Sequence, residues 1–358
     1  MTRIGFVLSS HGFGHMARNL PIIQKLTTRD DIELLIICAE KQIAWARENL
    51  SLEQLSKITF MVEQTDIGLI VKENSLEVDV LKLQTSCLDY LARLPELSKK
   101  YAKILVHHRI QLVITDIAPL GIGASQLAKI PNVLIGNFTW VELYQEWLPR
   151  KIVQAYAEIY RQVKLNISYA LHTPEFLNYG KNIYTASLLA RPVDLLEVER
   201  IKNQFDQPIV FISAGMSVNL DFSCNLDDLP YQLITTQQVA ITGSNVVKLS
   251  ADVANTQDYI AASDYVITKA GWGTVAEALL SHKKLALFAR ENVYEDRNTI
   301  EQLATDRLAI KIENSDLSDL PRLLKRMDKL NPVNSNKYYN SVNEICESII
   351  SLINDERK

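Results

Sequence analysis

Two histidines lie in a short glycine-containing segment near the start of the chain, residues 9–18. The segment follows an apolar run, Ile4 to Leu8, and precedes a stretch with helical spacing, so we expect it to join a strand to a helix. Histidine is the side chain best suited to accept a proton near neutral pH. His15 and His11 are therefore candidate general bases, although the spacing equally allows a tight turn with solvated histidines.

Glycines in the same segment suit the approach of an anion. A residue without a side chain lets the backbone come close to a ligand. The start of a helix presents unpaired N–H groups and the positive end of the helix dipole. Gly14, at the expected start of the helix, is therefore a candidate for contact with a bound diphosphate.

A second strand, glycine turn and helix are expected over residues 262–277. Glycines and a hydroxyl at the helix start would cradle a phosphate, and a lysine would neutralise it. Glu277 would accept hydrogen bonds from sugar hydroxyls, as an acidic residue does on the ribose in dinucleotide-binding folds. Thr-x-x-Glu is also a helix capping box, which is a competing structural reading. The phosphate candidates are Lys269, Gly271, Gly273 and Thr274.

A third polar segment, residues 290–298, follows the apolar run from Leu285 to Phe288. It is expected at the same end of the sheet as the second site, where a dense polar loop suits the recognition of hydroxyl groups. The alternative is a solvated charged loop in which Asp296 or Asn298 caps a helix.

Short apolar runs alternate with amphipathic stretches along the chain, and this alternation restarts near residue 208. Such an order is typical of parallel, doubly wound sheets covered by helices on both faces. We therefore expect an α/β protein with two Rossmann-like doubly wound domains facing across a cleft. The predicted domains are 1–190 and 191–335, and a C-terminal helix over 336–358 is expected to pack back on the first domain.

The apolar runs predict strands at 4–8, 32–38, 58–62, 112–115, 132–135, 208–212, 239–242, 246–249, 265–268 and 285–288. The helical spacing predicts a helix from Met16 to Leu26 with Pro21 near its first turn. It also predicts a long helical region from Leu76 to His107 that is interrupted at Pro95. The charged stretch from Arg191 to Gln207 lacks a strand pattern and is the expected linker.

Composition excludes several classes of function. The formal net charge is −4, from 38 basic and 42 acidic residues, and no run of five like charges occurs, which argues against nucleic acid as a partner. No apolar stretch reaches the roughly 18 residues of a membrane-spanning helix. The four cysteines are far apart and show no zinc-site spacing, which favours a reduced, cytoplasmic location.

Metal dependence is not indicated by any motif. No D-x-D triplet occurs, and acidic pairs such as Asp30-Asp31 lie outside the glycine turns. A helix dipole and Lys269 would then stabilise a departing diphosphate without a divalent ion. The G-x-G-x-x-G fingerprint of dinucleotide binding is absent, because residue 17 is alanine.

These motifs, in this order, resemble the GT-B glycosyltransferases, and in particular their family 28-like branch. The run Gly12-Phe13-Gly14-His15 resembles the N-terminal glycine-histidine loop of that branch, and residues 269–278 resemble its donor-binding motif. The residues 10–18 are closer still to the glycosyltransferase-like N-terminal half of plant arabinokinases. Residues 116–119 and 137–140 also resemble segments of those proteins.

The resemblance implies a nucleotide-sugar co-substrate, most often a UDP-sugar, and no other cofactor. It implies that His15 matches the base position, with His11 as a second candidate, and that Glu277 binds the ribose. The first domain would then take the acceptor and the second the donor. The donor-sugar loop would include Asn292, Glu295 and Asp296, and the diphosphate site would include Ser213 and Gly215.

Two departures affect the identity of the donor. The branch has a double glycine after the first strand of its second domain, whereas this chain has one glycine, Gly215. The donor-sugar loop carries Glu295-Asp296 in place of a glutamine pair.

Three functions stay open at this stage. The first is a metal-independent glycosyltransferase with an acceptor that is either lipid-linked or a small molecule; a lipid-linked acceptor would bring it to the inner face of a membrane. The second is a nucleotide-sugar hydrolase of the same fold, which transfers the sugar to water. The third is a non-catalytic protein that binds sugar nucleotides. The sequence leaves the oligomeric state undetermined.

Overall fold

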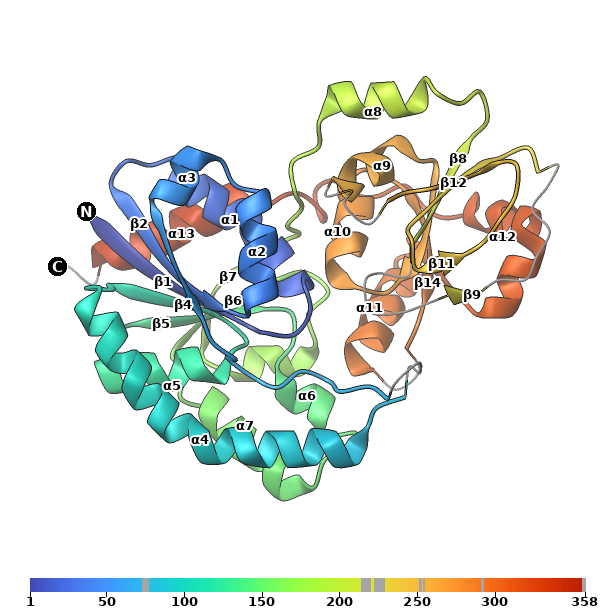
Figure 1. Ribbon diagram of the computed structural model, residues 1–358. Coiled ribbons are helices and arrows are strands. Elements are labelled where there is room, and N and C mark those ends of the chain that lie inside the picture. The colour runs from blue at the N-terminus through green and yellow to red at the C-terminus, as the bar shows by residue number, and fades with distance from the viewer. Residues whose placement is uncertain are drawn as a thin grey trace. The chain divides into compact units, whose positions relative to one another are not determined.

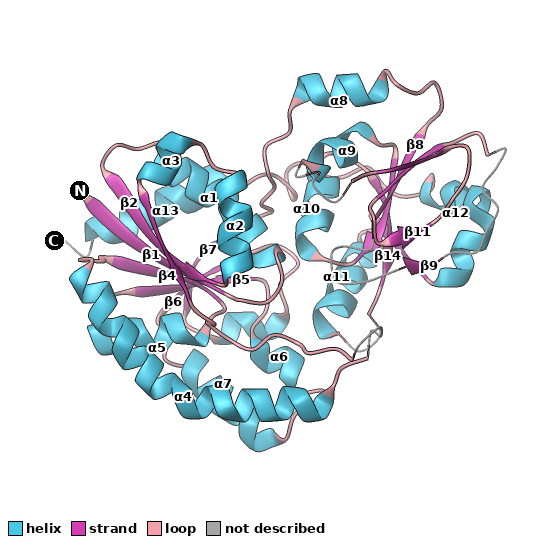
Figure 2. Cartoon of the chain, in the orientation of Figure 1, coloured by secondary structure: helices cyan, strands magenta, loops and turns pink. Residues whose placement is uncertain are grey.

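The chain divides into two compact units in a computed structural model (Figures 1 and 2). The first unit comprises Met1–Ser187 and Ser341–Lys358, and the second comprises Leu188–Asn340. The sequence placed these divisions after residues 190 and 335. The structure describes residues 1–72, 77–213, 220–221, 229–250, 253, 255–290 and 293–355.

A seven-stranded parallel sheet forms the centre of the first unit, in the order β3-β2-β1-β4-β5-β6-β7. Its strands are β1 Thr2–Leu8, β2 Ile32–Cys38, β3 Ile58–Val62, β4 Leu112–Asp116, β5 Asn132–Gly136, β6 Leu165–Ser168 and β7 Lys181–Thr185. The central strands are buried on both faces, which explains their nearly uninterrupted apolar sequences.

Helices cover both faces of this sheet, as Figure 2 shows. One group is α1 Gly14–Thr27, α2 Glu40–Glu48, α3 Leu52–Ser56 and α13 Val342–Asp355. The other group is α4 Val80–His107, α5 Pro119–Ala128, α6 Trp140–Tyr144 and α7 Arg150–Tyr160. A short 3-10 helix, Pro174–Asn178, precedes β7.

The second unit repeats this plan with a six-stranded parallel sheet, in the order β12-β10-β8-β13-β14-β15. Its strands are β8 Ile209–Ser213, β10 Gln232–Thr235, β12 Val246–Lys248, β13 Tyr265–Lys269, β14 Lys284–Phe288 and β15 Ala309–Ile312. A separate parallel pair is formed by β9 Leu220–Asp221 and β11 Val239–Ala240. The expected α/β architecture of two doubly wound, Rossmann-like units is confirmed.

Helices of the second unit pack on both faces of its sheet. They are α9 Thr256–Ala262, α10 Trp272–Leu280, α11 Tyr294–Thr305 and α12 Leu320–Met327, with a 3-10 helix at Asn314–Asp319. A further helix, α8 Leu195–Lys202, packs on α9. On one face, α12 buries Leu323, Leu324 and Met327 against Val210, Ile212 and Ile267 of the sheet. This core holds the carboxyl ends of β8 and β13 in place.

Two prolines lie inside helices where the sequence predicted otherwise. α4 runs without a break through Pro95, so the predicted interruption is wrong. α1 begins at Gly14, which places Pro21 in its interior and not near its first turn. A proline removes one helical hydrogen bond. In α4, the buried face continues on both sides of Pro95 through Tyr90, Leu94 and Tyr101, and its burial outweighs that loss.

The predicted linker also contains regular structure. α8 occupies Leu195–Lys202 and buries Val198 and Ile201. The Asp194 carboxylate begins this helix by accepting hydrogen bonds from the backbone N–H groups of Leu196, at 2.9 Å, and Glu197, at 3.3 Å. The helix was not predicted because only two of its residues are buried and the rest of the stretch is mostly charged.

Besides α8, several short elements were not predicted: β6, β7, β9, β10, β15, α3, α6 and α12. The strands β6 and β7 carry asparagines in short, mixed sequences that lack a clear apolar run. The helix α7 ends at Tyr160, and β6 begins at Leu165.

The C-terminal helix α13 packs on α1 in the first unit. Its buried side chains are Ile345, Cys346, Ile349 and Ile353, the stripe that the helical spacing indicated. The Cys346 thiol lies 3.9 Å from the backbone oxygen of Ile22 in α1. The last helix therefore completes the face of the first sheet that begins with α1.

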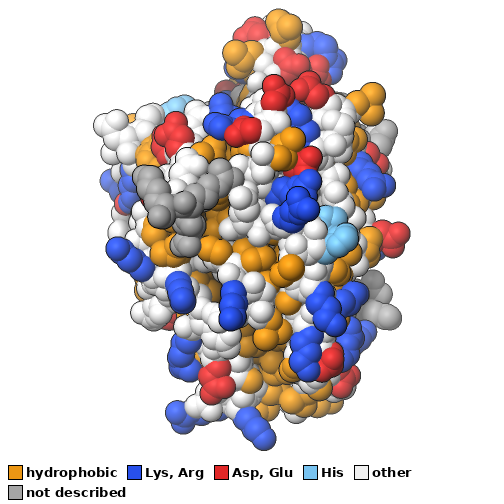
Figure 3. All heavy atoms as spheres, turned by 90° about the vertical axis from the view of Figure 1, so that its left-hand side faces the viewer, with side chains coloured by type: hydrophobic (Ala, Val, Ile, Leu, Met, Phe, Trp, Pro, Cys, Tyr) orange, Lys and Arg blue, Asp and Glu red, His pale blue; other side chains and the backbone are white. Residues whose placement is uncertain are grey.

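Charged side chains on the face drawn in Figure 3 are interspersed with neutral and hydrophobic ones. Several of the exposed charges form ion pairs, such as Arg3 with Glu33 at 2.7 Å and Lys99 with Glu96 at 2.7 Å. None of the helices in the described ranges combines the length and the apolar character that crossing a lipid bilayer requires.

Replacing Ile349 by alanine should lower the free energy of unfolding of the first unit by about 2–5 kcal/mol, because a fully buried branched side chain leaves a cavity against α1. The matched control is Leu81→Ala, at a position that is 78% exposed, for which a change below about 0.5 kcal/mol is expected. Hydrogen exchange should show the lost protection in the sheet of the first unit. Equal loss in the sheet of the second unit would contradict the assignment of α13 to the first.

Candidate functional site

The order of strands in each sheet reverses direction at one place. In the first unit this topological switch point lies between β1, which ends at Leu8, and β4, which ends at Asp116. In the second it lies between β8, which ends at Ser213, and β13, which ends at Lys269. Ligands of doubly wound sheets bind outside the carboxyl ends of the strands at such points. Both glycine turns that the sequence singled out begin here.

The loop after β1 is held in place by two neighbouring segments. The Gln42 side-chain amide donates to the backbone oxygens of Ser9, at 2.8 Å, and Gly12, at 2.6 Å. The backbone N–H of Ser10 donates to the Asp66 carboxylate at 2.9 Å. Gly12 adopts a φ of +64°, which glycine tolerates without strain. The start of α1, at Gly14, is therefore fixed before any ligand binds.

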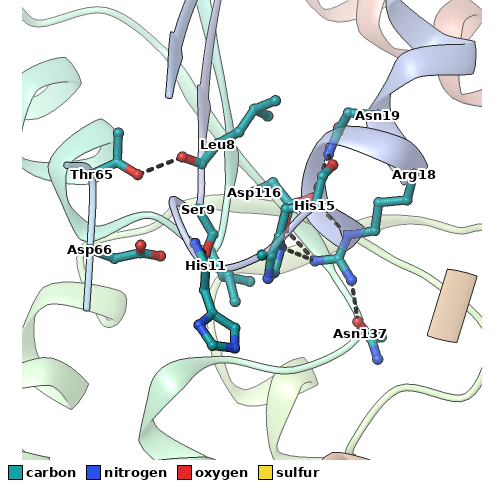
Figure 4. Close-up of polar contacts among 12 residues, drawn as sticks. Leu8, Ser9, His11, His15, Arg18, Asn19, Thr65, Asp66, Asp116 and Asn137 are labelled. Atoms are coloured by element: carbon teal, nitrogen blue, oxygen red, sulfur yellow. Dashed lines mark hydrogen bonds and ion pairs between the residues drawn. The ribbon is translucent and has the colours of Figure 1, made fainter. Parts of the chain in front are cut away.

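The buried carboxylate of Asp116 is the centre of the site in the first unit (Figure 4). The Arg18 guanidinium contacts both of its oxygens, through Nε to Oδ2 at 2.7 Å and through Nη2 to Oδ1. The Asn19 amide donates to Oδ2 at 2.5 Å. His15 Nδ1 lies 3.0 Å from Oδ1. Three side chains from the first turns of α1 thus converge on one carboxylate at the end of β4.

Helical spacing explains this convergence. Residues that are three and four apart share one face of a helix, so His15, Arg18 and Asn19 all face Asp116. The next residue, Ile117, has a φ of +47°, a strained conformation for a β-branched residue. The Tyr160 hydroxyl donates to the backbone oxygen of Ile117 at 2.5 Å. The fold thus accepts local strain directly beside the carboxylate.

Two groups of opposite hydrogen-bonding character face Nδ1 of His15. Asp116 Oδ1 lies 3.0 Å from Nδ1, and Arg18 Nη2 also lies 3.0 Å from it. An ionised carboxylate can only accept a hydrogen bond and a guanidinium can only donate one, so each tautomer of the ring satisfies one of the two contacts. A proton on Nδ1 is donated to Asp116 and leaves the lone pair on Nε2, which is the tautomer that a general base requires.

The ionisation of Asp116 is secured by its neighbours. Burial by itself raises the pKa of this carboxyl, but the charges of Arg18 and His15 and their hydrogen bonds hold the pKa well below its usual range. Asp116 is therefore an anion throughout the physiological range.

His11 lies apart from the Asp116 cluster, as Figure 4 shows. Its ring packs edge-on against Trp140, with 5.5 Å between ring centroids. It also fills the space beside Gly68, where an added Cβ would lie 1.9 Å from the His11 Nδ1. The Trp140 indole donates to Asp66 at 2.8 Å, and burial raises the pKa of that carboxyl. The geometry thus gives His15 a carboxylate partner on Nδ1, in Asp116.

The second unit presents a cation beside the N-terminus of α10. Lys269 ends β13, and α10 begins two residues after the turn at Ala270 with Gly271 as its N-cap. Burial, and then the charge of Arg290, lower the pKa of Lys269 to about 8. Gly273 has open space at its Cβ position, and Thr274 is partly exposed. Ser213 ends β8 beside Thr268, and Gly215 lies outside the described residues.

Glu277 does not form the predicted capping box, which is a correction. The N-cap of α10 is Gly271, with no side-chain cap. Instead, the carboxylate accepts two hydrogen bonds from Arg191, at 2.7 and 3.2 Å. Arg191 also donates to the Thr256 hydroxyl at 2.9 Å. This ion pair lies in the wall of a cavity of about 390 Å³ in the second unit. The ribose-binding role of Glu277 stays a prediction.

The polar loop after β14 is organised around one ion pair. Both oxygens of Asp296 accept hydrogen bonds from Arg290, through Nε at 2.8 Å and Nη2 at 2.7 Å. Asp296 is fully buried, so in this structure its carboxylate orients Arg290 and does not project from the loop. Glu295 lies beside it in the first turn of α11. Asn292 lies outside the described residues, and the donor-sugar role of this loop stays a prediction.

In the parts of the chain that the structure describes, no three His, Cys, Asp or Glu side chains are grouped so that they could hold a metal ion.

Comparison with known proteins places these sites in a family context. Residues 233–353 match the glycosyltransferase family 28 C-terminal domain. Solved structures of glycosyltransferases align with nearly the whole chain. UGT89C1 of Arabidopsis thaliana, complexed with UDP, aligns over 99% of this chain and 100% of its own, with a TM-score of 0.64 and 10% identity. The chain has the GT-B fold.

Other GT-B proteins give the same picture. UGT2 of Phytolacca americana, complexed with UDP-2fluoro-glucose and pterostilbene, has a TM-score of 0.62 and 11% identity over 99% of this chain and 100% of its own. CalG4, the calicheamicin glycosyltransferase, has a TM-score of 0.63 and 13% identity over 98% and 94%.

L-arabinokinase of Arabidopsis thaliana is 24% identical to this chain over 318 residues. The alignment covers 83% of this chain and 29% of the arabinokinase, so the chain spans less than a third of that protein.

Sequence reasoning missed the partners that hold the candidate side chains. The roles of Asp116, Arg18 and Arg191 were not predicted. Asp116 and Arg191 are distant in sequence from the side chains that they contact, and Arg18 was noted only as part of the segment 10–18. The i, i+3, i+4 spacing of His15, Arg18 and Asn19 was the signal that could have grouped three of them.

Replacing Asp116 by asparagine should lower the free energy of unfolding by about 3–5 kcal/mol, because Arg18 remains buried with its charge uncompensated. Glu33→Gln breaks the exposed ion pair with Arg3 and should change stability by less than about 1 kcal/mol. Chemical denaturation measures both. Equal, small effects would show that the Asp116 cluster is not electrostatically coupled.

Proposed function

We propose that this protein is a glycosyltransferase that moves a sugar from a nucleotide-sugar donor to a hydroxyl acceptor without a metal ion. The observation that carries the proposal is the His15–Asp116 pair at the topological switch point of the first unit, where His15 Nδ1 lies 3.0 Å from Asp116 Oδ1. In the proposal, Nδ1 carries the ring proton and donates it to Asp116, which leaves the lone pair on Nε2. The family 28 C-terminal domain match over residues 233–353 supports a donor site in the second unit.

The proposed reaction begins with proton transfer. His15 Nε2 takes the proton of the acceptor hydroxyl while the hydroxyl oxygen forms a bond to the anomeric carbon of the donor. The bond from that carbon to the diphosphate oxygen breaks, and its electron pair leaves with the nucleoside diphosphate. Asp116 stabilises the imidazolium that forms, in the manner of a carboxylate that orients a catalytic histidine.

The leaving group acquires negative charge in this step, and the second unit offers positive charge to meet it. Lys269 and the first N–H groups of α10 lie together at the switch point of that sheet. Fixed positive groups of this kind stabilise a developing anion. They supply the role that a divalent ion plays in other transferases, so we expect activity to persist in the presence of a chelator.

The donor is proposed to be a UDP-sugar. The support is the likeness to GT-B structures solved with UDP and with UDP-2fluoro-glucose. Stabilisation by the nucleoside diphosphates of uracil, guanine, thymine and adenine, each at the same concentration, tests this choice. A ligand at a hundred times its Kd adds about 2.7 kcal/mol to the free energy of unfolding. Preferential stabilisation by a base other than uracil would overturn it.

Replacing His15 by glutamine should lower the rate of transfer by about 10²–10⁴-fold, because the general base is lost. The glutamine side chain still occupies the space of the buried imidazole ring. UDP binding, measured by calorimetry, should be unchanged. The control is His108→Gln. His108 is the C-cap residue of α4 and is distant in sequence from the loop that carries His15. Wild-type turnover by His15→Gln would remove the base assignment, and prompt release of free sugar from donor alone would instead favour a hydrolase.

The affinity for UDP should fall as pH rises from 7 to 9. Because the pKa of Lys269 is about 8, its amine is largely neutral at pH 9. Binding of the diphosphate must then be accompanied by uptake of a proton by Lys269. The dissociation constant should therefore increase by up to roughly tenfold per pH unit. Lys269→Met should bind weakly at both pH values, and Lys269→Arg should bind equally well at both. A pH-independent wild type would show that Lys269 does not contact the diphosphate.

A further inference from the structure

We infer that Arg18 is a positioning residue of the transfer reaction: by balancing the charge of Asp116, it keeps His15 neutral and ready to accept a proton. The inference rests on the proposed function, because it concerns the base of that reaction. Arg18 itself is not expected to touch the acceptor or the donor, since only 5% of the residue is exposed.

The contacts of Arg18 leave it one possible arrangement. Nε and Nη2 contact the two oxygens of Asp116, and Nη1 donates to the Asn137 side chain at 2.6 Å. The guanidinium also lies over the Tyr169 ring, 5.6 Å from its centroid. A planar, two-pronged contact of this kind fixes a carboxylate in orientation as well as in charge.

The backbone at the end of β5 passes close to this arrangement. Gly136 has a φ of +153°, which side chains rarely adopt, and an added Cβ would lie 3.1 Å from Ile117 and in ordinary contact with Arg18 Nη2, at 3.5 Å. The guanidinium is thus packed between α1, the end of β4 and the end of β5.

The electrostatic consequence follows from counting charges. A buried carboxylate with only a histidine beside it favours the imidazolium, because that ring is then its sole counter-ion. Here Arg18 already supplies the positive charge, and a protonated His15 would lie 3.0 Å from the guanidinium Nη2. The paired carboxylate therefore attracts a second cation less strongly, and the like charge of Arg18 opposes it.

Other ionisable groups face His15 as well, and they enter the comparison. Asp66 lies close enough to interact with His15 through its charge, from the segment after β3. His11 belongs to the same loop and shares Trp140 as a ring neighbour. Asp116 and Arg18 are the charged groups within hydrogen-bond distance of the His15 ring in the described residues. Removing Arg18 is thus the change that alters the balance most.

A purely structural role for Arg18 makes a different prediction. A buried ion pair can serve only to hold β4 and α1 together. In that case the loss of Arg18 lowers activity equally at every pH, in proportion to the folded fraction. If Arg18 sets the protonation of His15, the loss is large at low pH and shrinks as pH rises.

The test compares the wild-type protein with Arg18→Ala and Arg18→Lys. We expect Arg18→Ala to lose about 10²-fold in kcat at pH 6, with the loss falling to within about tenfold at pH 9 and with little change in KM. The acidic limb of its pH profile should move upward by about one to three pH units. Arg18→Lys should move it less, because it keeps the charge. Added guanidinium ion should restore part of the activity of Arg18→Ala.

A second readout does not depend on activity. An NMR titration of the His15 ring proton, in wild type and in Arg18→Ala, reports protonation directly, and the upward shift should be the same as in the rate profile. The control is Arg3→Ala, which removes the exposed pair with Glu33 and should leave both readouts unchanged. If Arg18→Ala is too unstable, Arg18→Gln provides the same comparison with less loss of volume.

The outcomes separate this inference from the proposed function. Unshifted His15 titration, or an equal loss of activity at every pH without rescue by guanidinium, overturns the role of Arg18. A shifted titration in a protein without transferase activity toward any nucleotide-sugar leaves the role of Arg18 intact and overturns the proposed function.

Discussion

A carboxylate without access to water must be compensated from within the protein, and Asp116 imposes this requirement on the first unit. It is fully buried at the end of β4, and the side chains that compensate it, His15, Arg18 and Asn19, come from α1. The register of β1 against β4 brings Leu8 opposite Asp116, so the loop that follows β1 starts beside the carboxylate. The orientation of α1, and with it the histidine, is therefore tied to one charge.

The two units share one topology, but the buried charges at their switch points have opposite signs. In both, the sheet reverses its order between two adjacent strands, and a glycine-containing turn leads from one of them into a helix. In the first unit the buried charge at this point is negative and orients a histidine. In the second it is positive, with Lys269 at the end of β13, while Arg290, after β14, is paired with Asp296. A doubly wound sheet does not determine which charge it presents, so the residues after the strands decide the chemistry.

The fold was largely predictable because periodicity is a property of neighbouring residues. Central strands such as β1 and β8 are continuous apolar runs, and the alternation with helices indicated parallel sheets. Short strands with polar residues, such as β6 and β7, gave no such signal, because their burial is imposed by the elements around them. Pro95 was misleading for a related reason: its local penalty is visible in the sequence, whereas the packing of α4 that outweighs it is not.

The candidate site was predictable as a set of positions but not as a set of partners. The glycine turns marked where His15 and Lys269 would lie, since such turns have a local signature. The pairing of Glu277 with Arg191 and of Asp296 with Arg290 depends on side chains that meet only in three dimensions.

The return of α13 to α1 means that the chain passes from one unit to the other twice. The two passages lie side by side, because the Ser187 backbone N–H donates to the Ser341 hydroxyl at 2.7 Å and Leu188 pairs with Asn340. The second unit is thus an insertion whose ends are adjacent. During synthesis α13 leaves the ribosome after the whole insertion. The insertion can therefore fold before the first unit is complete. For protein engineering, the same adjacency makes residues 188–340 a natural cassette for exchange between related proteins.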